Sequence, residues 1–174
     1  MLLCSMIQNL SILALAMLST FAVAAQKPNT KHCYKLKTEE DLFDGTKTTR
    51  MGGLKYNMSM VTYTEIVAEG DTTFLVGGSL LKQGFDTQEG MTFLFDDGEK
   101  IELPGASHRA SAGQYGWTHV GVGAISRKGL EQFATVGVRA IRIGLYDSPE
   151  ITGNSAKSIF MTGAYCLLNR DNQK

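Results

Sequence analysis

Residues 91–103 read MTFLFDDGEKIEL, and this stretch predicts a β-hairpin. Its two arms, Met91–Phe95 and Lys100–Leu103, contain the apolar, aromatic and β-branched residues that are enriched in strands. The intervening turn is DDGE, in which Gly98 can adopt a positive φ and Asp96 can cap the turn with its side chain. Apolar and charged residues alternate in the second arm, so we expect one buried and one solvated face.

Outward from this hairpin, five further segments have the composition of strands. They lie at residues 58–67, 73–81, 118–125, 138–146 and 158–168. In the segment 138–146, Ile141, Ile143 and Leu145 are expected to share one face, with Arg142 on the other. Residues 104–117 show no apolar periodicity and are expected to form a long loop.

One short helix is expected between the strands. Ser126 can serve as its N-cap, Leu130 and Phe133 would lie on one face, and Gly137 would lie at its end. Strands at regular spacing, together with 19 glycines and only three prolines, indicate a turn-rich β protein. The sequence therefore predicts a mainly β domain, an antiparallel β-sandwich or jelly-roll-like fold, with about six or seven strands and one short helix.

The N-terminal residues have the pattern of a secretory signal peptide. Residues 1–26 contain no acidic or basic residue, and residues 12–23 form an apolar run that is shorter than the roughly 20 residues needed to cross a membrane. Small residues at Ala22, Ala24 and Ala25 follow the pattern of a cleavage site, and either Met1 or Met6 can start the leader. We expect residues 1–25 to be cleaved and the mature chain to be periplasmic or secreted, without a membrane span.

The mature chain of about 149 residues supports one domain. Residues 26–56 are polar and are expected to be an irregular N-terminal segment, and residues 57–174 are expected to form the β domain. Within the N-terminal segment, the candidates for anchors in the core are Tyr34, Leu36, Leu42 and Phe43.

The cysteines favour a disulfide. Cys4 lies in the leader, so the mature chain contains only Cys33 and Cys166. An even number of cysteines in an oxidising compartment favours a Cys33–Cys166 bridge. The alternative is two unrelated buried thiols, because free cysteine is among the most buried residue types. With His32 alone as a further ligand, these cysteines lack zinc-site spacing, and no metal is expected.

Charge and motifs restrict the function. The 17 basic and 17 acidic residues are scattered, which argues against a nucleic-acid-binding surface. Motifs such as H-E-x-x-H, G-x-S-x-G and the Walker loop do not occur, so no catalytic residues and no cofactor are expected. We expect a non-enzymatic extracytoplasmic protein that binds a ligand or partner or has a structural role. The alternative is a small secreted hydrolase using His108 or His119, which would need a histidine within hydrogen-bond reach of a carboxylate or serine in a concave site.

The segment before residue 118 suggests a binding surface. Tyr115 and Trp117 are aromatic residues in the expected loop, and His108 and Arg109 add polar donors nearby. Such loops commonly recognise carbohydrates, peptides or protein partners, here including proteins of the cell envelope. The alternative is that Trp117 starts the next strand and fills the core, because tryptophan is usually well buried.

The order of motifs resembles a group of small secreted bacterial β-rich proteins of unknown function. The shared features are a leader, a polar start, a hairpin with D-G-E-K at its turn, a short helix, an Ile/Arg strand and a terminal C-L strand. In this chain they correspond to the segments DLFDGT at 41–46, MTFLFDDGEKIEL at 91–103 and the run from Leu130 through Phe133 to GVRAIRI at 137–143. The resemblance covers most of the mature chain, and it implies no activity and assigns no catalytic residue.

Overall fold

The structure is a computed structural model that describes residue 28 and residues 30–51, 61–70 and 73–170. The predicted signal peptide, residues 1–25, lies outside the described residues, as does the start of the strand predicted at 58–67.

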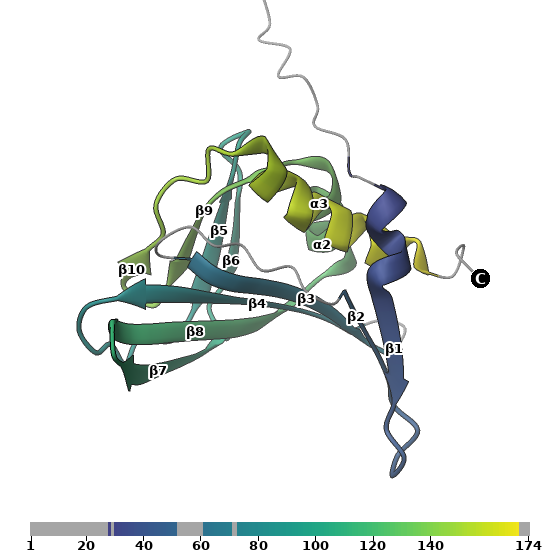
Figure 1. Cartoon of the computed structure of the whole chain (residues 1–174), viewed down its shortest axis with the longest axis horizontal. Helices are drawn as coiled ribbons and strands as arrows, with labels where there is room; N and C mark the ends of the chain where they lie inside the picture. The colour runs from purple at the N-terminus through teal and green to yellow at the C-terminus, as the bar shows by residue number, and fades with distance from the viewer. Residues whose placement is uncertain (1–27, 29, 52–60, 71–72, 171–174) are drawn as a thin grey trace, which may run out of the picture.

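Two antiparallel sheets form the body of the protein (Figure 1). The larger sheet has the order β1 (Leu36–Glu40), β2 (Lys47–Met51), β3 (Val61–Glu69), β4 (Thr73–Lys82), β8 (Gly116–Ile125) and β7 (Ser107–Gly113). The smaller sheet has the order β10 (Tyr146–Asp147), β9 (Val138–Ile143), β5 (Met91–Phe95) and β6 (Lys100–Leu103). The prediction of a mainly β, antiparallel fold is confirmed. The described residues form ten strands, however, rather than six or seven.

The predicted hairpin at residues 91–103 is confirmed as β5–β6. Met91, Phe93 and Phe95 alternate with half-buried residues, so one face of β5 enters the core. Gly98 has a φ of +87°, as the turn requires. The capping side chain is Asp97, which accepts a hydrogen bond from Glu99 N at 3.0 Å, and the prediction of Asp96 in this role is wrong.

Asp96 instead fixes the hairpin to a helix. Its carboxylate pairs with Lys157 Nζ at 2.5 Å, and its backbone N–H donates to Gly137 O at 3.0 Å.

The described residues contain two α-helices and one 3₁₀ helix, η1 (Thr30–Lys35). The first α-helix, α2 (Arg127–Thr135), is the predicted one, and Ser126 Oγ accepts the N-cap hydrogen bond from Gly129 N at 3.1 Å. The second, α3 (Asn154–Leu168), overturns the strand predicted at 158–168. Its buried residues include Ala156, Phe160 and Ala164, which recur every four residues and form one helical face. Burial of this face outweighs the strand propensity of the aromatic and β-branched residues in the segment.

Two segments predicted to lack regular structure contain strands. Residues 104–117, predicted as a loop, include β7 and the turn into β8. β7 lies at the edge of its sheet and carries small and polar residues, so it lacks the apolar alternation that would have indicated a strand. Residues 26–56, predicted as irregular, include η1, β1 and β2. β1 is almost entirely exposed, and its polar sequence reflects that exposure.

The strand predicted at 138–146 is shorter than expected. β9 ends at Ile143, and Gly144, with a φ of +56°, turns the chain into β10. Leu145 is therefore exposed rather than on the buried face with Ile141 and Ile143, whereas Arg142 is exposed as predicted.

The buried faces of both sheets and the two α-helices share one core. Phe133 of α2 makes edge-to-face contacts with Phe93 at 4.9 Å and Phe95 at 5.0 Å, measured between ring centroids. Helices α2 and α3 pack against each other, and Figure 1 shows both on the same side of the molecule. Among the described residues, no helix is both long and apolar enough to span a membrane.

The predicted Cys33–Cys166 disulfide is confirmed. It joins η1 to α3 with a Cα–Cα distance of 5.2 Å and spans 133 residues of sequence. In the chain-entropy model such a bridge stabilises the folded state by about 5 kcal/mol. It anchors the base of the β1–β2 hairpin to the body of the protein.

Candidate functional site

The aromatic residues predicted to bind a ligand lie at the tip of the β7–β8 hairpin. Tyr115 is 80% exposed and lies in the turn. Trp117 lies near the start of β8 and is half-buried, with its ring centroid 5.3 Å from that of Phe85. It lies outside the main buried core, so it starts a strand without filling the core.

The structure separates the other two predicted residues from this tip. In the register of β7 and β8, Trp117 lies opposite Ala112, and His108, four positions before Ala112 in β7, lies opposite Gly121. His108 and Arg109 are adjacent in one strand, so their side chains point to opposite faces of the sheet. Arg109 is exposed, and His108 points towards His119. The four predicted residues are therefore distributed over the tip and both faces of the β7–β8 hairpin.

His108 and His119 form a continuous chain of hydrogen bonds. His108 Nε2 lies 3.0 Å from His119 Nδ1. The outer nitrogens contact backbone carbonyls: His108 Nδ1 lies 2.7 Å from Gln88 O, and His119 Nε2 lies 3.1 Å from Gly84 O. Tyr146 packs on the imidazole of His119, and the centroids of the two rings are 4.2 Å apart. His119 has no exposed surface, and burial lowers its pKa.

Asp86 is the carboxylate of this cluster. It is buried, and its oxygens accept hydrogen bonds from Gln88 N at 2.8 Å and Leu145 N at 2.7 Å. The hydrogen bond from Gln88 N is the main cause that holds the pKa of Asp86 below its usual value. The hydrogen bond from Leu145 N and the two nearby histidines lower this pKa further. A β-carbon at Gly144 would collide with the Asp86 carboxylate and lie 3.0 Å from His108 Nδ1, so only glycine fits between them.

The serine next to this cluster in the sequence does not point towards it. Ser107 precedes His108 in β7 and therefore points to the opposite face, where its Oγ lies 3.4 Å from Val122 O. His119 is fully buried, so a substrate would have to displace the protein to reach it. The arrangement can bind and share protons, and no hydroxyl nucleophile is hydrogen-bonded to either histidine among the described contacts.

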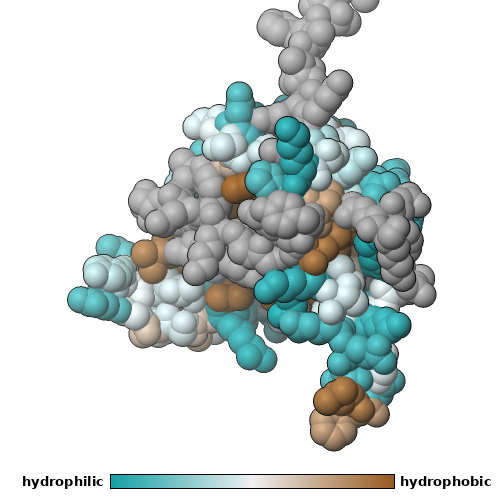
Figure 2. Space-filling view, turned by 45° about the vertical axis from the view of Figure 1, so that its right-hand side comes forward, coloured by the Kyte–Doolittle hydropathy of each residue, from teal (hydrophilic) through white to brown (hydrophobic). Residues whose placement is uncertain are grey.

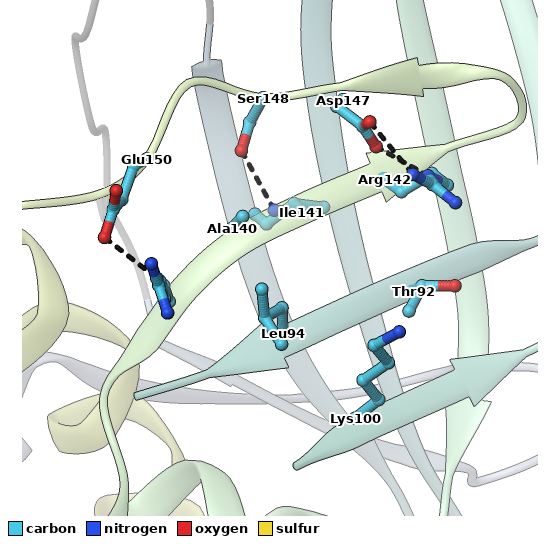
Figure 3. A pocket seen from close by; sticks show the side chains of 10 residues that line it. Thr92, Leu94, Lys100, Ala140, Ile141, Arg142, Asp147, Ser148 and Glu150 are labelled. Carbon is cyan, nitrogen blue, oxygen red and sulfur yellow. Dashed lines mark hydrogen bonds and ion pairs between the residues drawn. The ribbon is translucent and has the colours of Figure 1, made fainter. Parts of the chain in front are cut away.

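A pocket of about 420 Å³ lies on the face of the smaller sheet that is turned away from the core (Figure 3). Arg142 forms two hydrogen bonds to Asp147, at 2.5 and 2.9 Å, and this contact raises the pKa of Arg142 and lowers that of Asp147. Arg139 pairs with Glu150 at 2.8 Å. Both guanidinium groups therefore have carboxylate partners, and the side chain of Lys100 also lines this pocket.

Among the described residues, the most exposed large apolar side chains lie at the tip of the β1–β2 hairpin. Leu42 is 97% and Phe43 101% exposed, so the prediction that they anchor the core is wrong. Figure 1 shows the tip of this hairpin projecting beyond the other strands of the larger sheet, and Figure 2 shows an apolar surface at its end.

Hydrogen bonds fix the conformation of this tip. Asp41 Oδ1 accepts from Phe43 N at 2.7 Å, and Asp44 Oδ1 accepts from Thr46 N at 2.8 Å. Asp41 and Thr46 also pair through their backbones, and Gly45 supplies a positive φ of +72°. These are Asx turns, in which a short carboxylate caps its own turn. The segment DLFDGT therefore encodes a structured turn with its two apolar side chains on the outside.

The tip also carries negative charge. Along the arms, Glu40 pairs with Lys47 at 3.7 Å and Glu39 pairs with Arg50 at 3.4 Å. In the described part of the chain, Asp41 and Asp44 form no ion pair. The hydrogen bond from Thr46 N holds the pKa of Asp44 below its usual value, so this carboxylate stays ionised.

No signal in the sequence separates this tip from a core-forming segment, because Leu and Phe are the residues expected in a core. The turn chemistry of DLFDGT could have indicated a hairpin, but not that its tip extends into solvent. In the described ranges, no group of three or more His, Cys, Asp or Glu residues is placed to hold a metal ion. Comparison of the chain with protein-family models, with curated proteins and with solved structures finds no match.

Proposed function

We propose that this is an exported, non-enzymatic binding protein that inserts the tip of its β1–β2 hairpin into an apolar pocket of a partner protein. The observation that carries the proposal is the full exposure of Leu42 and Phe43 on a turn fixed by hydrogen bonds. Isolated apolar residues on a surface need no explanation, but two large ones at the end of a projecting hairpin indicate an interaction site.

The energetics support a tip of this size. Burying a leucine or phenylalanine side chain contributes about 1.5–3 kcal/mol each. The Asx turns hold the tip in one conformation before binding, which reduces the conformational entropy lost on association. Two such side chains can therefore act as hot spots of an interface.

The negative charge at the tip indicates which kind of partner surface would be complementary. Asp41 and Asp44 flank the two apolar residues, so a pocket rimmed by lysine or arginine would be complementary. An anionic membrane surface would repel the same carboxylates. The tip therefore fits a protein pocket better than an anionic bilayer.

Two further features support the proposed export of the protein and the proposed scaffold of the hairpin. The Cys33–Cys166 bridge suits an oxidising compartment, which supports export after cleavage of the predicted leader. The two sheets share one core, which supports a β-sandwich scaffold from which the hairpin projects. The disulfide holds the segment that leads into β1, so the arm has a rigid base.

Site-specific photocrosslinking tests the proposal. The full chain is produced in its source cell with p-benzoylphenylalanine at position 43, which resembles the native aromatic side chain. Ultraviolet light is expected to produce one defined adduct with another protein. The matched control places the same amino acid at position 115, because Tyr115 is also exposed at a hairpin tip.

Purified components then test the contact quantitatively. Leu42→Ser and Phe43→Ser are each expected to weaken binding of the crosslinked partner by about 30-fold or more, the effect of a ~2 kcal/mol hot spot. Leu145→Ser, at an exposed leucine elsewhere, is expected to leave affinity unchanged. Equal crosslinking from positions 43 and 115, or adducts only with lipid or a second copy of this chain, would overturn the proposal.

A further inference from the structure

The hydrogen-bond chain through His108 and His119 constrains the number of protons on the two rings. At each end the partner is a backbone carbonyl, Gln88 O for His108 Nδ1 and Gly84 O for His119 Nε2. A carbonyl oxygen only accepts hydrogen bonds, so both outer nitrogens must carry hydrogen.

The inner nitrogens then decide the charge. A neutral imidazole carries one N–H, so two neutral rings with protonated outer nitrogens would face each other with lone pairs. These nitrogens, His108 Nε2 and His119 Nδ1, are 3.0 Å apart, a hydrogen-bond distance. With one additional proton between them every contact in the chain is satisfied, whereas two additional protons would set two N–H groups against each other.

We infer that His108 and His119 form a binding site for one shared proton, which fastens the connection between β4 and β5 onto strands β7 and β8. The connection supplies both carbonyls, Gly84 and Gln88, and the strands supply the two rings. His119 is fully buried, whereas His108 is only partly buried. Because burial penalises the charged form, the extra proton resides on His108, and His119 is the neutral acceptor.

The surroundings stabilise a single positive charge. Asp86, from the same connection, interacts with both histidines, and its two backbone donors keep it ionised. Tyr146 of β10 packs on His119, and β4 places the apolar Leu80 opposite His119. The charge of the shared proton and the charge of the Asp86 carboxylate thus offset each other.

This site makes stability depend on pH in both directions. In the unfolded chain each histidine has a pKa of about 6.5. Above this value the folded pair holds a proton that the unfolded chain has released, so stability falls as the pH rises and the pair deprotonates. Below this value the unfolded chain binds two protons and the folded pair only one, so stability also falls as the pH drops. Stability is therefore greatest near neutral pH.

Nitrogen NMR of the wild-type imidazoles tests the inference directly. At neutral pH, we expect His108 to be doubly protonated and His119 to be the neutral Nε2–H tautomer. A scalar coupling across the hydrogen bond should join His108 Nε2 to His119 Nδ1. As the pair loses its proton, the connection that carries Asp86 loses one of the hydrogen bonds that hold it, so exchange of the Leu145 amide, which is bonded to Asp86, should rise by about tenfold beyond its intrinsic pH dependence. Two neutral rings at neutral pH, or two independent titrations without coupling, would overturn it.

A variant adds a second readout. In His108→Gln the side-chain amide can still donate a hydrogen bond but cannot hold the shared proton. Its unfolding midpoint should lose the decline on the alkaline side that the wild type shows. Arg109→Gln, at the exposed neighbouring position on the opposite face, should retain the wild-type profile. If the unfolding midpoint of His108→Gln still declines at alkaline pH, the proposed proton-binding site is contradicted. The NMR measurement uses the wild-type protein and so does not depend on whether this variant folds.

Discussion

The β1–β2 and β5–β6 hairpins use the same turn chemistry and place their aromatic residues in opposite environments. Each tip has a glycine with positive φ, Gly45 at +72° and Gly98 at +87°. In each tip an aspartate carboxylate accepts a hydrogen bond from the backbone two residues later. Yet Phe95 is fully buried, and Phe43 is fully exposed.

The difference lies in the position of the aromatic residue relative to the turn. Phe95 is the last residue of β5, on the face that meets Phe133 of α2. Phe43 lies inside the turn itself, beyond the end of β1, where it is fully exposed and none of the described elements covers it. The comparison teaches that turn residues determine the local bend, whereas the neighbours of the hairpin determine whether its apolar residues stabilise the fold or remain available to a partner.

The largest expected effect comes from deleting one aromatic ring in each hairpin. Phe95→Ala should lower the free energy of unfolding by about 3–5 kcal/mol, because it removes a buried ring and leaves a cavity. Phe43→Ala should change it by less than about 0.5 kcal/mol, because the exposed ring contributes no burial. Chemical denaturation of both variants measures the difference. Similar losses in the two would mean that the β1–β2 tip packs against the protein.

A smaller effect is expected from the turn glycines. Gly98→Val and Gly45→Val should each cost about 1–3 kcal/mol, because a β-branched residue is strained at positive φ. Both sites have open space around the added β-carbon, so the cost reports the backbone alone. The control is Gly105→Val, at a glycine that also has open space but lacks a positive φ.

The thermal unfolding of these three variants sharpens the comparison. Equal losses at positions 45 and 98 would show that the projecting hairpin unfolds together with the body. A loss at position 98 alone would show that the hairpin unfolds independently, and an equal loss at position 105 would contradict the assignment of strain to φ.

The smallest effect concerns the charge of the projecting tip. The pKa of Asp44 is lowered chiefly by its hydrogen bond from Thr46 N. A carboxyl whose folded pKa is depressed contributes stability above its unfolded pKa of about 3.9, and this is lost as the pH falls through the folded value. Carbon NMR of the Asp44 carboxyl and the Thr46 amide shift should therefore titrate together in acid. Asp44→Asn, which keeps an oxygen acceptor without a titrating group, should abolish the shift of the Thr46 amide, and its persistence would assign the shift to another group.

Local chemistry made several elements predictable from the sequence. The β5–β6 hairpin follows from its alternation and Gly98, and α2 follows from the Ser126 cap and the apolar face of Leu130 and Phe133. The Cys33–Cys166 bridge follows from the cysteine count and the expected compartment. The hairpin and the helix depend on residues that are close in the sequence, and the disulfide prediction is simple because the expected mature chain contains only two cysteines.

The candidate sites were less predictable. His108 was identified as a polar donor near Tyr115 and Trp117, but its partners are His119 and Gln88, and the aromatic tip lies elsewhere. Leu42 and Phe43 have the composition of core residues and lie outside the core. In both cases the sequence identified residues with notable side chains, but it did not predict where those side chains lie in the fold.

By itself, the sequence determined the antiparallel β class, the turn at Gly98, the N-cap of α2 and the cysteine pair, because these depend on local conformational preferences or on counting. Only the tertiary structure decided that residues 158–168 are helical, that β7 replaces a loop, and that His108 meets His119 beside Asp86. The physical reason is that burial and hydrogen bonding between segments far apart in the chain outweigh local propensity. Which apolar residues remain exposed depends on the elements that surround them.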